Sequence, residues 1–254
     1  MKLAVLSDIH GNLEAFQAVL DAIEHLRIDT VISLGDNIGY GPDSEAVLAL
    51  IRARKIASVL GNHEMAVKNE HNLAWFNPVA QTALAIAQSQ LSDASLAWIH
   101  QLPRYRVTAG LRFVHGVPPD SAFLYLFQVP ENRLIQKLAQ SEEPICFAGH
   151  THELGIICWD GTRLEKQTPG PGRYCLDPGQ KYIINAGSVG QPRDGSAGAK
   201  FVLYDTGTRE LTVRAVAYPF EKTQKKIIAA GIPRMYADRL AVGADPSKVK
   251  GANQ

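Results

Sequence analysis

The chain has 254 residues, of which 46% are hydrophobic and 20% are charged, a composition that can bury a substantial core. Its 26 basic and 25 acidic side chains give a formal net charge of +1, which argues against a nucleic-acid or anionic-membrane partner. The apolar run at the N-terminus ends at Asp8 and is too short for a signal peptide or a transmembrane helix.

The first third of the chain alternates predicted strands with predicted helices. Residues 2–8, 30–36 and 56–64 are typical of buried strands with polar ends, and residues 12–29 and 44–55 carry apolar side chains at helical spacing. This order predicts a parallel sheet with helices on its faces. Ligands bind to such sheets outside the carboxyl ends of the strands.

The later part of the chain changes character. Residues 75–91 and 92–102 are predicted to form two helices, the second capped by Ser92. Shorter strands follow at 104–116, 144–150, 155–166 (a hairpin through Asp160-Gly161), 181–187, 200–206 and 210–218. They predict a second, mixed or antiparallel sheet beside the first. Residues 167–180 are rich in proline and glycine and are predicted to form an exposed loop.

No shift in composition marks a domain boundary. We therefore expect one domain over residues 1–243, with a helical insertion at about 65–102 and a loosely ordered tail at 244–254. The three cysteines, Cys146, Cys158 and Cys175, form no CxxC pair. They indicate reduced thiols and a cytoplasmic protein.

Metal-ligating residue types follow five of the predicted strands. They are found in Asp8-Ile9-His10, Gly35-Asp36, Gly61-Asn62-His63-Glu64, His115-Gly116 and Gly149-His150-Thr151-His152. A single Asp or His in such a place is usually a helix cap or a turn residue, but five at the same edge predict a metal site. On an extended chain, residues two apart point to the same side. We therefore expect the side chains of Asp8 and His10 to point in nearly the same direction, and likewise those of His150 and His152.

These motifs resemble the set D-x-H, G-D, G-N-H-[DE], H and G-H-x-H of the calcineurin-like metallophosphoesterases, in the same order. Within that family the chain is most similar to the small prokaryotic phosphodiesterase and diadenosine-tetraphosphatase-like branch. The similarity continues through residues 185–194 (NAGSVGQPRD) into the final strands, so it covers most of the chain. The resemblance implies an α/β fold, a four-layer α/β/β/α sandwich of two mixed sheets flanked by helices.

The resemblance also implies a site for two divalent metal ions and hydrolysis of a phosphate ester by a hydroxide that bridges them. Asp8, His10 and His152 would bind the first ion, Asn62, His115 and His150 the second, and Asp36 both. His63 would stand beside them, as proton donor to the leaving oxygen or as a stabiliser of the transition state. Histidines together with carboxylates suit Mn, Fe, Zn or Ni rather than an all-oxygen Mg or Ca cage.

One motif departs from the pattern of many larger family members, which carry G-D-x-x-D-R. Here residues 35–42 read GDNIGYGP, so Gly39 and Tyr40 replace the last two residues of that motif. The missing arginine argues against a phosphoprotein substrate. Arg193 could supply positive charge from another loop, and Asn12 and Tyr40 are further candidates for substrate contact. All three could equally be structural residues.

The helical insertion carries aromatic residues in NLAWFNP, residues 72–78. Packing of an amphipathic helix pair explains them, and a partial lid or a base-stacking wall is the alternative. We expect a phosphodiesterase that acts on a small phosphate ester or nucleotide. The alternatives are a nucleotide polyphosphate hydrolase, a phosphomonoesterase or protein phosphatase, a nuclease, and a non-catalytic interaction module. Near-zero net charge argues against the nuclease, and the complete ligand set argues against the silent module. The oligomeric state stays open.

Overall fold

Strand β1 (Lys2–Leu6) is covered on both faces in the computed structural model, which describes residues 1–241. Leu3 and Val5 pack into a core between two sheets, whereas Ala4 and Leu6 pack under helices. This alternation follows from the two-residue period of a strand. It explains why the segment is apolar throughout.

The first sheet has the order β3-β2-β1-β11-β12-β9. Its other strands are β2 (Thr30–Ser33), β3 (Ala57–Ser58), β9 (Gly172–Cys175), β11 (Ala199–Asp205) and β12 (Glu210–Val216). Strands β1, β2 and β3 run parallel to one another, as predicted. Strand β11 pairs antiparallel with β1, so the sheet as a whole is mixed.

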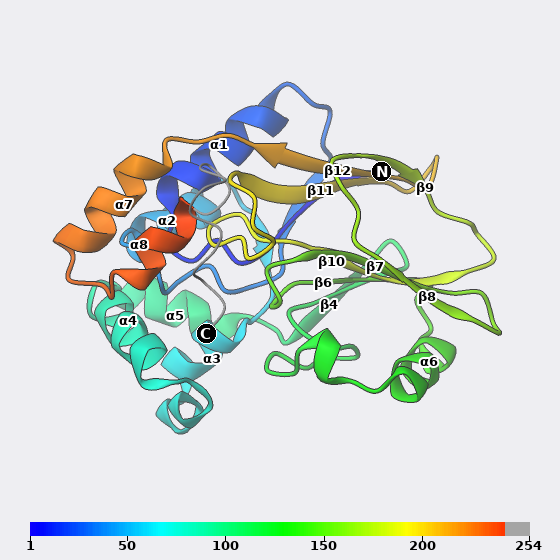
Figure 1. Cartoon of the computed structure of the whole chain (residues 1–254), viewed down its shortest axis with the longest axis horizontal. Helices are drawn as coiled ribbons and strands as arrows, with labels where there is room; N and C mark the ends of the chain where they lie inside the picture. The colour runs from blue at the N-terminus through cyan, green and yellow to red at the C-terminus, as the bar shows by residue number, and fades with distance from the viewer. Residues whose placement is uncertain (242–254) are drawn as a thin grey trace.

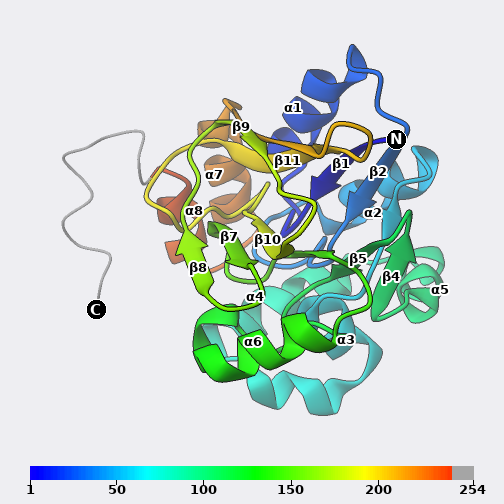
Figure 2. The ribbon, with the colours of Figure 1, turned by 90° about the vertical axis from the view of Figure 1, so that its right-hand side faces the viewer.

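The second sheet has the order β4-β5-β6-β10-β7-β8. Its strands are β4 (Tyr105–Thr108), β5 (Leu111–Val114), β6 (Ile145–Ala148), β7 (Leu154–Trp159), β8 (Leu164–Gln167) and β10 (Lys181–Ala186). Strands β7 and β8 form the predicted hairpin. The two sheets lie face to face, with α1 and α6 on opposite outer sides (Figures 1 and 2).

Helices cover the outer faces of both sheets. They are α1 (Leu13–Glu24), α2 (Ser44–Ala53), α3 (Asn62–Lys68), α4 (Pro78–Ser89), α5 (Asp93–Gln101), α6 (Glu131–Gln140), α7 (Phe220–Ala229) and α8 (Met235–Leu240), with 3-10 helices η1 (Glu70–Trp75) and η2 (Leu126–Gln128). Helix α6 packs on the second sheet, and residues of the other α-helices share a core with β1 and β11. The predicted four-layer sandwich is confirmed.

Three predictions made from the sequence were wrong. Strands β11 and β12 join the first sheet, not the second. Residues 167–180 are not all loop, because Gly172–Cys175 form β9, which pairs with β12 at a sheet edge where alternate residues stay exposed. The third predicted strand is only two residues long, and α3 begins at Asn62. Helices α7 and α8 were not predicted.

Other expectations can be compared directly with the structure. Ser92 caps α5 as predicted, accepting a hydrogen bond from the backbone N–H of Ser95 at 3.2 Å. Cys146, Cys158 and Cys175 are unpaired. Among the described residues, no helix combines the length and apolar character needed to cross a membrane. The expected tail at 244–254 lies outside the described residues.

Candidate metal centre

The candidate ligands lie on loops that follow β1, β2, β5 and β6 and on the first turn of α3. Their backbone is not extended, contrary to the prediction. Asp8 and His10 have φ of 53° and 48°, and His150 and His152 have φ of 69° and 63°. Six of the nine non-glycine residues with positive φ in the described part of the chain belong to this site, the other two being Asp36 and Tyr40. Left-handed residues cost about 1 kcal/mol or more each, and they concentrate at functional sites.

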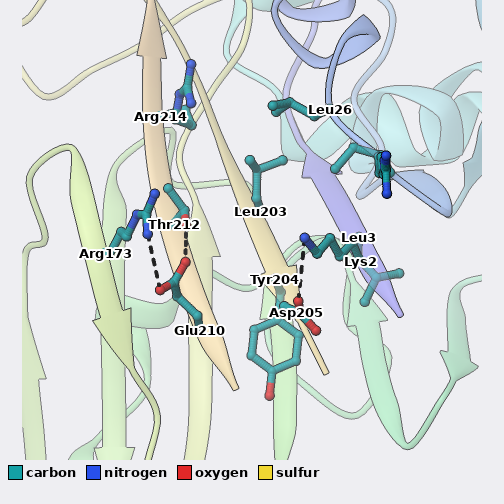
Figure 3. Close-up of a pocket in the computed structure, with 12 residues that line it drawn as sticks. Lys2, Leu3, Leu26, Arg173, Leu203, Tyr204, Asp205, Glu210, Thr212 and Arg214 are labelled. Carbon is teal, nitrogen blue, oxygen red and sulfur yellow. Dashed lines mark hydrogen bonds and ion pairs between the residues drawn. The ribbon is translucent and has the colours of Figure 1, made fainter. Parts of the chain in front are cut away.

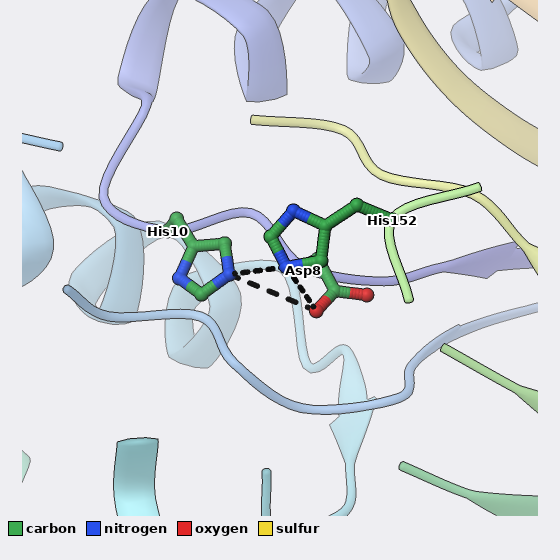
Figure 4. A group of neighbouring side chains, drawn as sticks. All are labelled: Asp8, His10 and His152. Atoms are coloured by element: carbon green, nitrogen blue, oxygen red, sulfur yellow. Dashed lines mark hydrogen bonds and ion pairs between the residues drawn. The ribbon is translucent and has the colours of Figure 1, made fainter. Parts of the chain in front are cut away.

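Asp8, His10 and His152 form a first cluster (Figure 4). The Nε2 atoms of His10 and His152 are 3.1 Å apart. Asp8 Oδ1 lies 3.2 Å from His152 Nε2 and 3.7 Å from His10 Nε2. The three side chains therefore converge on one point although residue 152 is far from the other two in sequence.

Asp36, His115 and His150 form a second cluster, which Asn62 joins. His115 Nε2 lies 3.3 Å from Asp36 Oδ2 and 3.1 Å from His150 Nδ1. Asn62 Oδ1 is 3.1 Å from the same His115 nitrogen. Asp36 Oδ2 is also only 3.7 Å from His10 Nε2, so this carboxylate faces both clusters.

The outer nitrogen of each clustered histidine is held by a backbone carbonyl. The pairs are His10 Nδ1 with Ile38 O at 3.0 Å, His115 Nδ1 with Leu34 O at 2.9 Å, His150 Nε2 with Phe123 O at 3.0 Å, and His152 Nδ1 with Gln191 O at 2.6 Å. Because a carbonyl only accepts, each outer nitrogen carries the proton, and the inner nitrogen of a neutral ring presents a lone pair. Two lone pairs facing each other at 3.1 Å repel unless a cation or proton lies between them.

The carboxylates supply the complementary charge. Asp8 Oδ1 is buried without a hydrogen-bond partner among the described residues, an arrangement that is costly unless a cation compensates it. Burial lowers the pKa of His150 to about 3. Burial also opposes the charged form of His115, yet the Asp36 carboxylate raises the pKa of His115 to about 9. His150 is therefore held as a neutral ring with a free lone pair, the Asp36 carboxylate favours positive charge beside it, and this donor set fits metal ions.

His63 lies beside both clusters, the position that the family resemblance implied for it. Its Nε2 is 3.9 Å from Asp36 Oδ2, and its backbone N–H donates to Asp36 Oδ1 at 2.9 Å. Burial lowers the pKa of His63 well below its ordinary value, although Asp36 acts in the opposite direction. Gly39, at φ 87°, leaves room for this ring, because a Cβ there would lie 2.2 Å from His63 Nδ1.

Tyr40 occupies the place of the missing arginine. It is buried, and its ring lies 4.3 Å from that of His10 and 4.5 Å from that of His63. On its other side it stacks on Tyr236 of α8 at 4.3 Å. Tyr40 thus forms an aromatic wall of the site where the longer motif would place a positive charge.

The two other candidates for substrate contact differ. Arg193 is solvent-exposed, and its positive charge acts together with burial to lower the pKa of His152 to about 4. The backbone N–H of Arg193 donates to the carbonyl of His152 at 3.3 Å, so this residue lies next to the first cluster. Asn12 is buried and caps α1 through Ala15 N, and it also contacts Gly190 O, Tyr218 Oη and Thr223 Oγ1. The structure gives Asn12 a scaffolding position with its amide already engaged.

Sequence analysis assigned no role to Glu64, the third residue of α3. Its buried carboxylate accepts hydrogen bonds from the backbone N–H groups of Asp36 at 2.9 Å, Asn37 at 2.7 Å and Gly61 at 3.0 Å. Burial and the Asp36 charge raise the pKa of Glu64. A glutamate three residues after a helix-capping position is a signal for such a bond back to the cap, but the link to Asp36 is long-range.

Glu64→Gln is expected to lower the free energy of unfolding by about 1–3 kcal/mol. An amide NH2 would then face backbone N–H donors that the carboxylate now accepts, and a buried donor left unsatisfied costs about that much. Urea unfolding measures the change, with the exposed Glu24→Gln as a control that should stay within about 0.5 kcal/mol. Equal stability of the two variants would contradict this role.

A separate cavity of about 260 Å³ lies at the first sheet, lined in part by Lys2, Arg173, Asp205 and Glu210 (Figure 3). Arg173 pairs with Glu210 at 3.8 Å and Lys2 with Asp205 at 3.9 Å. No histidine lines it. Its acids are already paired with bases, so this cavity is a weaker candidate for an active site than the two clusters.

Comparisons with known proteins agree with the family resemblance drawn from the motifs. Residues 1–209 match the calcineurin-like phosphoesterase superfamily domain. A metallophosphoesterase from Sphaerobacter thermophilus superposes with a TM-score of 0.83 at 33% identity, over 96% of this chain and 99% of that one. An uncharacterized protein of Methanocaldococcus jannaschii is 31% identical over 95% of this chain and 98% of its own length.

Shorter matches involve proteins with named activities. Serine/threonine-protein phosphatase 2 of Escherichia coli is 44% identical over 142 residues, which are 52% of this chain and 65% of that protein. A symmetrical bis(5'-nucleosyl)-tetraphosphatase of Wigglesworthia glossinidia brevipalpis is 47% identical over 64 residues, 24% of each chain. The resemblance drawn from the motifs is confirmed: the chain belongs to the calcineurin-like phosphoesterase superfamily and is a hydrolase of phosphate esters.

Proposed function

We propose that the chain hydrolyses a phosphodiester with the help of two divalent transition-metal ions. The observation that supports this most directly is the position of Asp36, whose Oδ2 lies within 3.7 Å of a histidine from each cluster. One carboxylate between two donor sets is the arrangement that a dinuclear site requires. Mn, Fe, Zn and Ni all suit these donors.

Each cluster would hold one ion. Asp8, His10 and His152 would bind the first, Asn62, His115 and His150 the second, and Asp36 would bridge them. When bound, the two ions would neutralise the phosphate and activate water for attack on phosphorus. The buried carbonyl contacts of the four histidines fix their ring orientation before any ligand arrives.

His63 would act on the leaving group. Its imidazole is fully buried and is placed by Gly39 and by its own backbone bond to Asp36. It would therefore stand beside the reacting phosphate without being needed as a ligand. From there it would donate a proton to the leaving oxygen, or stabilise charge on it.

The wall formed by Tyr40 favours a diester over a monoester. A monoester dianion gains from a guanidinium at that place, whereas a diester carries a single charge that the ions would neutralise alone. A protein phosphatase activity, suggested by the E. coli relative, has less support for the same reason. Hydrolysis of a nucleotide polyphosphate is the second candidate, because Arg193 lies near the first cluster and could contact additional phosphates.

The substrate class can be measured with the manganese-loaded protein. We expect kcat/KM for bis-p-nitrophenyl phosphate to exceed that for p-nitrophenyl phosphate. Arg193→Ala should reduce kcat/KM for diadenosine tetraphosphate by about tenfold or more, the typical loss for one charge-assisted contact. The same variant should change bis-p-nitrophenyl phosphate hydrolysis much less.

Arg163→Ala, which removes an exposed arginine from the β7–β8 hairpin, is the control and should leave both activities unchanged. A clear preference for the monoester would contradict the diesterase assignment. If Arg193→Ala had no effect on any substrate, Arg193 would have no part in substrate binding.

A further inference from the structure

A recess of about 210 Å³ opens directly beside the second cluster. Asn62 and His150 line it on the side of the donors, and the aromatic side chains of Trp75, Phe76, Phe123 and Tyr125 line much of the rest. A phosphate held at the donors would therefore have its organic substituent at or inside this recess.

Trp75 is largely exposed to solvent. Its side chain is 72% exposed at the end of η1, whereas the next residue, Phe76, is buried with its ring 5.0 Å from that of His63. The Trp75 ring lies 5.6 Å from that of Phe123, at 34° between planes. Phe76 thus anchors the segment, and the indole remains available for a flat ligand.

Two other aromatic residues of the lining, Phe123 and Tyr125, contact the donor His150. The Tyr125 ring stacks on the His150 ring at 3.8 Å and 18° between planes. The carbonyl of Phe123 accepts from His150 Nε2 at 3.0 Å. This part of the lining is therefore held in place relative to the point where phosphate would bind.

The recess is neutral and carries amide groups. Its lining in the described chain contains no Lys, Arg, Asp or Glu, which disfavours further phosphates or an acidic peptide inside it. Asn77 and Gln128 contribute carboxamides whose oxygens accept from Ala80 N at 2.9 Å and Tyr125 N at 3.2 Å. Their NH2 groups can donate to a ring nitrogen or carbonyl, which suits a nucleobase.

We propose that this recess binds the nucleobase of a nucleoside phosphate ester, stacked against Trp75. The inference rests on the proposed phosphodiesterase function and adds a substrate class to it. Base stacking on an aromatic side chain tolerates any base, so selection for a base is expected without strong selection among bases.

Steady-state kinetics can measure how much the nucleobase contributes to substrate binding. The methyl phosphodiesters of adenosine 5'-monophosphate and of ribose 5-phosphate share charge and scissile bonds and differ only in adenine. We expect the adenosine ester to have a KM about tenfold lower. Trp75→Leu should raise that KM about tenfold and change kcat little, with no more than a twofold effect on the ribose ester. Trp75→Phe, which keeps a flat ring, should retain much of the difference.

A binding measurement does not depend on turnover. Adenosine 5'-monophosphate should quench tryptophan fluorescence, and ribose 5-phosphate should not. The chain offers matched controls, because Trp98 and Trp159 are its other tryptophans and neither lines the recess. The quench should persist in Trp98→Phe and Trp159→Phe and disappear in Trp75→Phe. Since Trp75 is exposed, its replacement leaves the core intact.

The two proposals can fail separately. If Trp75→Leu left the two KM values in their original ratio, and if both ligands quenched equally, the base-binding recess would be excluded while the esterase assignment stood. If the metal-loaded protein hydrolysed neither these esters nor bis-p-nitrophenyl phosphate, the proposed phosphodiesterase function would fail. The fluorescence result would then still decide whether the recess binds a base.

Discussion

Asp36→Asn is expected to remove most of the metal from the protein. Reconstituted with manganese and desalted, the unmodified chain should hold about two ions, as a dinuclear site requires. Asp36 Oδ2 faces His115 at 3.3 Å and His10 at 3.7 Å, while Oδ1 is engaged with the His63 backbone N–H. An asparagine can keep its oxygen at the Oδ1 position only by turning its NH2 toward both ions. Elemental analysis of the desalted protein gives the metal content directly.

Asp8→Asn is the matched comparison, because Asp8 belongs to the first cluster alone. It should lose about one ion and keep the other. Thermal unfolding adds a second readout, since bound ions stabilise the folded state: a chelator should lower the Tm of the unmodified chain and barely change that of Asp36→Asn. One ion or none in the unmodified protein would contradict the dinuclear site, and equal losses in both variants would contradict the bridging position.

The fold was predictable where it depends on local pattern. The alternation of apolar runs around β1, β2 and β3 gave a parallel sheet with covering helices, because period and helix spacing are local properties. The partner of a strand is not local. β1 pairs with β11, in a register that joins Lys2 to Asp205, and nothing in either segment marks the other. That is why β11, β12 and the short edge strand β9 could not be assigned to the first sheet.

In the candidate site, too, some features could be predicted from the sequence and others could not. The residue types at the strand ends were sufficient to predict that Asp8, Asp36, His115 and His150 lie close together. The way they point was not predictable, since Asp8 and His150 adopt left-handed backbone conformations that no apolar pattern encodes.

The contacts that support the candidate ligands could not be predicted from the sequence, for a related reason. Glu64 holds the Asp36 loop, Tyr125 stacks on His150, and Tyr236 of α8 backs Tyr40. Each of these contacts joins segments that are distant in sequence or separated by a turn. Tyr40 is the clearest example: its sequence position showed only that an arginine was missing, and the structure shows what stands there instead.

His63→Asn should separate chemistry from metal binding. His63 is not assigned as a ligand, and its backbone N–H, which carries the bond to Asp36, survives the substitution. Metal content should therefore stay close to normal. The kcat should fall by about two to four orders of magnitude, the usual range for loss of a general acid. Elemental analysis and steady-state kinetics on the same preparation provide both values.

The dependence of the kcat loss on the leaving group distinguishes the two roles considered for His63. A proton donor matters most when the departing oxygen is a poor leaving group, so the loss should be larger for an alkyl diester than for bis-p-nitrophenyl phosphate, whose p-nitrophenolate needs little protonation. Gly39→Ala tests His63 without removing its side chain. A Cβ on residue 39 would lie 2.2 Å from His63 Nδ1, so the imidazole ring would have to move. This variant should reproduce the larger loss on the alkyl diester. Equal losses on both substrates would instead identify His63 as an electrostatic stabiliser of the transition state.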